Sequence, residues 1–212
     1  MSKKNKGKSK GFHMLGFSGW GGESKVEGYS AKACKHWRQK VSLGKNLVVY
    51  ASGFRHGADD DDALKANPQP TVGVYFDSSW WRRLTGFVAV DMETPVVWKW
   101  PFLISDWPDM GMPYGGDETT IIDVVEGLIK EGHRVEIGCI GGHGRTGTAL
   151  SMLRIRMQGM KALEAIESVR VDYCEDAVES SKQIDAVYKF AGEEPPEHPK
   201  ITPAKGYGSS YY

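Results

Sequence analysis

Residues 135–149 read VEIGCIGGHGRTGTA, and this stretch carries the strongest information on the fold. Residues 135–138 have the composition of a short β-strand, which ends at Cys139. Five residues separate Cys139 from Arg145, and the apolar pattern from Arg145 to Gln158 predicts a helix. The sequence therefore predicts a glycine-rich loop that joins a strand to the amino end of a helix.

This loop has the features of an anion site that holds a reactive cysteine. Backbone N–H groups at the amino end of a helix point toward one position, together with the positive end of the helix dipole. Such a position binds phosphate and favours the thiolate form of a nearby cysteine. We expect Cys139 to be a nucleophile, Arg145 to bind two phosphate oxygens through its planar guanidinium, and Thr146 to donate to the thiolate. The expected phosphate-binding residues are the five between them: Ile140, Gly141, Gly142, His143 and Gly144.

The same residues have two other interpretations, and Cys174 adds a third possibility. The loop could be a tight joint between a strand and a helix, with Cys139 as a small buried hydrophobic residue. A zinc site made from Cys139 and His143 lacks a second ligand pair at a suitable spacing. Oxidation could pair Cys174 with Cys139 and protect the nucleophile, provided that the two lie close together.

Residues 139–147, CIGGHGRTG, resemble the Cys-x5-Arg-Ser/Thr signature of protein tyrosine and dual-specificity phosphatases. The resemblance implies the fold of that family and hydrolysis through a phosphocysteine intermediate, with no metal or organic cofactor. One position departs from the family, because Gly138 stands where those enzymes usually have histidine before the cysteine. That histidine supports the loop and the reactive thiol.

A second motif precedes the cysteine loop by about 30 residues. Residues 107–113 read WPDMGMP and resemble the WPD loop of tyrosine phosphatases, whose aspartic acid protonates the leaving oxygen. The match assigns that role to Asp109. Asp106 is the alternative, because residues 100–106 resemble the strand end that precedes the acid in dual-specificity enzymes.

A weaker match concerns the hydrolytic water. In tyrosine phosphatases a glutamine-bearing segment that follows a similar arginine positions this water, and the corresponding residues here are Glu179 and Gln183. An ordinary helix face is an equally good interpretation of the segment.

Two substrate classes and one binding function fit these residues. The five loop residues include no lysine, which disfavours heavily phosphorylated ligands, and the resemblance of residues 107–113 to the WPD loop implies phosphotyrosine or mixed phosphoprotein substrates. An RNA 5′-triphosphatase of the same superfamily is an alternative, supported by the lysine-rich start MSKKNKGKSK. A phosphoprotein-binding module with weak catalysis would explain Gly138 and Glu179.

The pattern of strands and helices predicts an α/β domain with a central, mostly parallel sheet flanked by helices. We expect a disordered basic tail at 1–22, a phosphatase domain at 23–191 and a second disordered tail at 192–212. Further strands are predicted at residues 47–50, 71–76, 87–90 and 96–100. Further helices are predicted at residues 117–130, 161–169 and 177–191.

Composition and charge indicate which partners and which cellular compartment to expect for the protein. Lys and Arg total 27, as do Asp and Glu, so there is no overall field to attract nucleic acid or membrane lipid. The three cysteines, Cys34, Cys139 and Cys174, follow no secretory signal, which favours a reducing, cytoplasmic setting. We expect a phosphorylated protein or peptide as the partner, no membrane contact, and nucleic acid only as the less favoured alternative.

Overall fold

The computed structural model describes residues 36, 38–53, 68–78, 100–112 and 118–198. All of them belong to one unit, Cys34–Tyr212, and the other unit, Met1–Ala33, lies outside the described residues. The strand predicted at 87–90, the tail predicted at 1–22 and residues 199–212 of the second tail lie outside them as well.

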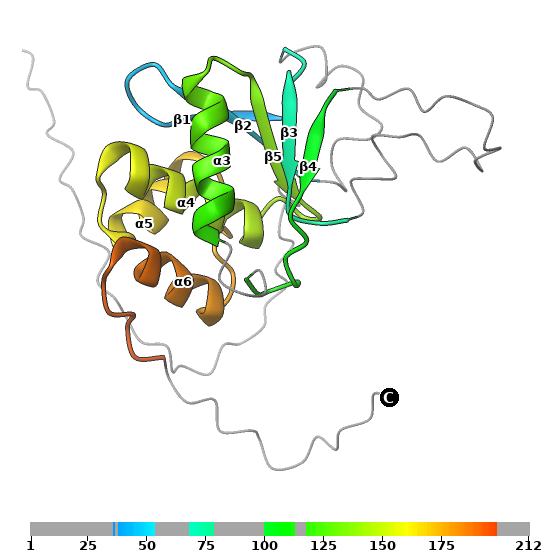
Figure 1. Ribbon diagram of the computed structural model, residues 1–212. Coiled ribbons are helices and arrows are strands. Elements are labelled where there is room, and N and C mark those ends of the chain that lie inside the picture. The colour runs from blue at the N-terminus through cyan, green and yellow to red at the C-terminus, as the bar shows by residue number, and fades with distance from the viewer. Residues whose placement is uncertain (1–35, 37, 54–67, 79–99, 113–117, 199–212) are drawn as a thin grey trace, which may run out of the picture. The chain divides into compact units, whose positions relative to one another are not determined.

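A five-stranded sheet with the order β1-β2-β5-β3-β4 forms the centre of this unit (Figure 1). β1 is antiparallel to β2, whereas β2, β5, β3 and β4 run parallel to one another. The strands are β1 (Gln39–Ser42), β2 (Val48–Gly53), β3 (Val72–Tyr75), β4 (Phe102–Ile104) and β5 (Val135–Cys139).

Four helices gather on one side of the sheet in Figure 1: α3 (Glu118–Lys130), α4 (Gly144–Gln158), α5 (Ala162–Asp172) and α6 (Ser181–Ala191). Alternate strand residues such as Ala51, Val74 and Ile137 are fully buried in one hydrophobic core with Leu150 and Leu153 of α4. Each fully buried aliphatic side chain contributes about 1.5–3 kcal/mol. The expected α/β fold with a mostly parallel sheet flanked by helices is confirmed.

The opposite face of the central strands carries a buried polar network around Glu136. Its carboxylate accepts hydrogen bonds from Tyr75 and Ser52, both at 2.6 Å, and forms a 3.0 Å ion pair with Arg38. Trp100 donates to the Tyr75 hydroxyl at 2.9 Å. Burial, followed by the charge of Glu136, raises the pKa of Tyr75 well above 10.0. These bonds satisfy a carboxylate that would be costly to bury alone.

Two strand predictions need correction. The strand predicted at 96–100 falls on residues outside the described ones except Trp100, which is not in a strand, and β4 begins at Phe102. Proline has no N–H for a ladder, so pairing as a strand begins after Pro101. β1 was not predicted, because Gln39–Ser42 is a short polar edge strand in which only Val41 is buried.

The start of α6 also differs from the prediction, since the helix begins at Ser181 rather than at Ala177. Val178 has a φ of 60°, a left-handed conformation that interrupts a right-handed helix. Ser180 and Gln183 then form a reciprocal capping box, in which each side chain accepts from the other residue's backbone N–H. No helix within the described ranges is long and apolar enough to cross a membrane.

Candidate active site

The parallel strands bring their carboxyl ends to one edge of the sheet. Cys139 ends the central strand β5, Asp77 follows β3, and Trp107 follows β4. In open α/β sheets this edge is where ligands bind, because the loops and helix amino ends converge there. The topology therefore places the two predicted motifs next to each other, although they lie far apart in the sequence.

The loop from Cys139 to Arg145, called the Cys139 loop below, surrounds a buried thiol. Cys139 is 3% exposed, and its Sγ accepts hydrogen bonds from the Gly142 backbone N–H and the Thr146 hydroxyl, both at 3.2 Å. Gly142 has a φ of 82°, which a residue with a side chain adopts only with strain. Two donors on one sulfur stabilise negative charge there.

The first turn of α4 lies tightly against the start of α6. A Cβ atom at Gly144 would clash with the side-chain ends of Glu179 and Gln183, so a larger residue here would displace both side chains. The Gln183 Oε1 accepts from the Glu179 backbone N–H at 2.8 Å. Its Nε2 is buried and has no hydrogen-bond partner among the described residues. This amide therefore retains a donor next to the amino end of α4.

Arg145 joins the Cys139 loop to the two neighbouring strand ends. Its Nη1 donates to the carbonyl oxygens of Phe76 at 3.1 Å and Trp107 at 2.7 Å. The same nitrogen lies 2.9 Å from Asp77 Oδ2, and Nη2 lies 3.4 Å from Asp109 Oδ1. The side chain is 3% exposed, so its orientation is fixed by these partners.

The segment Ser105–Met112, called the Trp107 loop below, is anchored at its tryptophan. The Trp107 ring is buried against Phe76, with ring centroids 4.4 Å apart. The Asp106 carboxylate accepts from the Ser78 backbone N–H at 3.2 Å, whereas the side chain of Asp109 is 80% exposed. Of the two candidate acids, Asp109 contacts Arg145, and Asp106 fixes the loop to the end of β3.

The remaining loop residues contact a different part of the chain. Tyr173 donates its hydroxyl proton to the Gly142 carbonyl oxygen at 2.5 Å. The His143 Nδ1 lies 3.2 Å from Cys174 Sγ and 3.2 Å from His36 Nε2. Cys174 thus contacts an imidazole of the Cys139 loop. Ile140, Gly141 and His143 are half-buried, and Gly142 and Gly144 are buried.

Two curated relatives from Methanocaldococcus jannaschii are similar to the chain in sequence. The uncharacterized protein MJECL20 is 35% identical over 133 residues, which cover 58% of this chain and 86% of the relative. The uncharacterized protein MJ0215 is 34% identical over 117 residues, which cover 55% of this chain and 68% of the relative. This chain belongs to their family. No protein-family model matches it.

Solved structures of phosphatases are similar to the fold of this chain. Tk-PTP in its active form matches with a TM-score of 0.53 at 20% identity, covering 74% of this chain and 98% of Tk-PTP. Kinase associated phosphatase matches with a TM-score of 0.58 at 16% identity, covering 75% of this chain and 96% of that phosphatase. PTPMT1, solved in complex with PI(5)P, matches with a TM-score of 0.53 at 15% identity, covering 68% of this chain and 90% of PTPMT1. The chain has the fold of tyrosine and dual-specificity phosphatases.

Sequence reasoning missed three residues that contact the predicted site in this member of the family. Asp77 pairs with Arg145, and Tyr173 and His36 contact the Cys139 loop. Asp77 could have been found, because it directly follows a predicted strand and strand ends carry functional groups in α/β folds. His36 and Tyr173 gave no signal, because neither lies in a motif.

Proposed function

We propose that this chain hydrolyses phosphate monoesters through a covalent phosphocysteine on Cys139. The observation that carries the proposal is the pair of hydrogen bonds to Cys139 Sγ, one from the Gly142 N–H and one from the Thr146 hydroxyl. Both donors favour a thiolate, which is the nucleophilic form of cysteine. The phosphatase fold of the chain supports the same function.

The phosphate would bind at the amino end of α4, where the N–H groups of the Cys139 loop face the equatorial oxygens. The guanidinium of Arg145 adds a positive charge at this position. Its orientation is already fixed by the Phe76 and Trp107 carbonyl oxygens and by Asp77. Binding substrate therefore requires little ordering of the arginine, which favours transition-state stabilisation.

In the first step, the Cys139 sulfur forms a bond to phosphorus as the bond to the leaving oxygen breaks. We propose that Asp109 donates a proton to that oxygen. This carboxyl group is exposed to solvent and close to Arg145, as a group that meets incoming substrate must be. Asp106 is a poorer candidate, because its carboxylate accepts from the Ser78 backbone N–H.

In the second step, water attacks the phosphocysteine and transfers a proton to the Asp109 carboxylate. The sulfur leaves as a thiolate, which the Thr146 hydroxyl stabilises. The buried Gln183 Nε2, which has no hydrogen-bond partner in the described part of the chain, is a suitable donor for orienting this water. The nearby Glu179 carboxylate, also beside Gly144, is a second candidate.

We infer that the substrate is a phosphotyrosine or another phosphorylated residue of a protein. The loop residues between Cys139 and Arg145 offer no lysine, and His143 is their only ionisable side chain. A ligand with several phosphates would therefore find few additional charges in the loop. The fold alone does not select the substrate class, since PTPMT1 with the same fold was solved in complex with PI(5)P.

The deciding experiment compares wild type with Cys139→Ser on p-nitrophenyl phosphate, in a reductant and with a metal chelator present. We expect turnover by wild type and its complete loss in the variant. Phosphotyrosine peptides, phosphoserine peptides and 5′-triphosphorylated RNA, assayed by phosphate release, then identify the substrate. Preference for the RNA would favour the triphosphatase alternative. Tight phosphopeptide binding without turnover by folded wild type would favour a binding module.

A further inference from the structure

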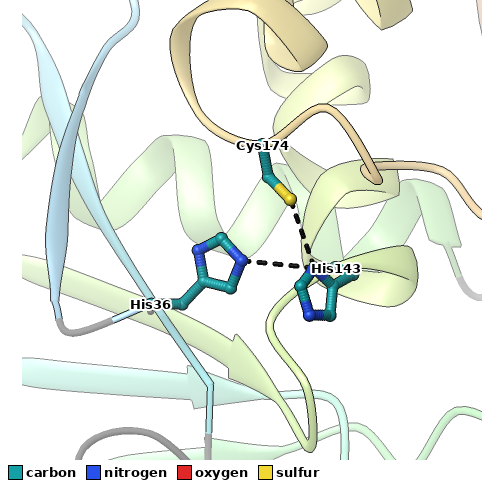
Figure 2. Close-up of side chains that lie close together, drawn as sticks. All are labelled: His36, His143 and Cys174. Atoms are coloured by element: carbon teal, nitrogen blue, oxygen red, sulfur yellow. Dashed lines mark hydrogen bonds between the residues drawn. The ribbon is translucent and has the colours of Figure 1, made fainter. Parts of the chain in front are cut away.

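Three side chains with metal-binding atoms meet at the Cys139 loop, and the proposed reaction assigns no step to any of these three side chains. Figure 2 shows His36 and Cys174 both directed at the ring of His143. His36 comes from the segment before β1, His143 from the Cys139 loop and Cys174 from the turn after α5. Their donor atoms all lie within 4.8 Å of one another.

Two of the donor–donor distances are close to those around a tetrahedral ion. His143 Nδ1 lies 3.2 Å from His36 Nε2 and 3.2 Å from Cys174 Sγ. A zinc ion with Zn–N bonds of about 2.0–2.1 Å and a Zn–S bond of about 2.3 Å keeps its ligand atoms about 3.3–3.6 Å apart. The two distances from His143 Nδ1 are close to this range, and the donor atoms of His36 and Cys174 lie within 4.8 Å of each other, so the side chains would move closer together around the ion.

Hydrogen bonding alone accounts poorly for this arrangement. An imidazole nitrogen has either one lone pair or one N–H in the ring plane, so it forms one good hydrogen bond. The His143 Nδ1 nevertheless faces two neighbours at equal distance. A metal ion placed between the three atoms would use the lone pair of each and remove this competition.

Burial of the ligand side chains restricts their movement and so favours tight binding of an ion. His36 is 2% exposed and Cys174 is 5% exposed, whereas His143 is half-buried. The Tyr173 ring lies 4.7 Å from the ring of His36 and restricts its orientation. The protein interior thus fixes the side chains of His36 and Cys174. The half-buried His143 lies on the side from which an ion would enter the site.

We propose that His36, His143 and Cys174 bind a zinc-type divalent ion. On binding, the Cys174 thiol releases its proton to solvent, and both imidazoles coordinate as neutral rings. Two nitrogens and one thiolate are suitable ligands for zinc, and water fills the fourth tetrahedral position. The ion would connect three segments far apart in sequence and hold the Cys139 loop through His143.

The site differs from the zinc alternative made from Cys139 and His143, which lacks a second ligand pair. That alternative used Cys139, the proposed nucleophile, whereas this one uses Cys174 and leaves Cys139 to its own donors. Metal binding here needs no turnover at Cys139. The proposal can therefore be tested in a protein without phosphatase activity.

The test uses the full chain, stripped with a chelator and titrated with Zn²⁺ by calorimetry and with Co²⁺ by absorbance. Wild type should bind one ion per chain and give a thiolate-to-cobalt charge-transfer band. Cys174→Ser should remove this band and weaken zinc binding by more than about 100-fold, since even outer contacts to a metal ligand change affinity by about 10–100-fold. His36→Ala should weaken binding to a similar extent.

Matched variants separate ligand loss from misfolding. Cys139→Ser, which removes the other described thiol, and His133→Ala, which removes an exposed imidazole, should both keep the ion. Cys174→His should bind zinc again, without the cobalt charge-transfer band. Absence of stoichiometric binding in wild type overturns the proposal. Binding that survives Cys174→Ser, or that Cys139→Ser abolishes, overturns it as well.

Discussion

The Nη1 atom of Arg145 donates a 2.7 Å hydrogen bond to the backbone carbonyl oxygen of Trp107. This bond joins the first turn of α4 to the Trp107 loop, which carries the proposed general acid. A second contact, 3.4 Å from Nη2 to Asp109 Oδ1, joins the same two parts. The arginine proposed to bind phosphate therefore also determines where the acid loop lies.

Arg145→Lys should lower kcat/KM by about 100- to 1000-fold, the loss typical of one transition-state hydrogen-bond donor. In Arg145 one nitrogen, Nη1, makes both contacts with Trp107 and Asp77, whereas lysine has a single nitrogen and no planar fork to bind two phosphate oxygens as well. Arg154→Lys is the matched control, because Arg154 is equally buried on α4 and pairs with Asp172 instead. Equal losses in the two variants, measured on p-nitrophenyl phosphate, would contradict the assigned role.

Asp77→Ala should lower kcat/KM by about 10- to 100-fold, because small misplacements of a catalytic group have effects of this size. Asp77 is a positioning residue that orients Arg145 through a 2.9 Å ion pair. Asp77→Asn keeps an oxygen acceptor and should restore much of the activity. The two variants are compared by steady-state kinetics and by their affinity for inorganic phosphate. A purely structural role would change stability but leave the phosphate affinity of the folded protein unaltered.

Asp109→Asn should slow hydrolysis of phenyl phosphate by about 100- to 10,000-fold, the usual contribution of a general acid. The loss should be smaller on p-nitrophenyl phosphate, whose leaving oxygen needs less protonation. Asp106→Asn is the comparison, because it weakens the contact with Ser78 without removing the proposed acid. If Asp106→Asn instead shows the stronger dependence on the leaving group, the two assignments must be exchanged.

Thr146→Val should slow breakdown of the phosphocysteine by about 10- to 100-fold, since a hydrogen bond to a charged group contributes about 1.5–3 kcal/mol. Rapid-quench experiments should then show a burst of product followed by a slow steady state. Thr148→Val serves as the control, because the Thr148 hydroxyl donates to the Gly144 carbonyl oxygen within α4. A burst in both variants, or in neither, would count against Thr146 as the donor to the leaving thiolate.

Tyr75→Phe should reduce the loss of stability at alkaline pH. Burial, followed by Glu136, raises the pKa of folded Tyr75 above 10.0, near which the unfolded chain ionises. Stability is therefore fully present below about pH 10 and falls as pH rises toward the folded pKa, by up to about 1.4 kcal/mol per pH unit. Urea unfolding between about pH 8 and pH 11 measures the slope. An identical slope in the variant would exclude this tyrosine as its source.

Much of the fold could be predicted because its signals are local. The sequence of the Cys139 loop contains the strand end, the glycines and the helix start within a few residues of one another. The start of α6 was also encoded locally, by Ser180 and Gln183 at capping-box spacing, and the prediction placed it too early. β1 could not be predicted, because a polar edge strand is stabilised by pairing with β2 and not by its own pattern.

The sequence by itself determined the cysteine loop, its helix and two candidate acids, because each depends on residues that are neighbours in the chain. Only the tertiary structure decided which residues surround them. Strand order brings Asp77 to Arg145 across 68 positions, and the turn after α5 brings Cys174 to His143 across 31. Such contacts arise from the packing of parallel strands and helices against one core, and no local spacing in a single sequence records that packing.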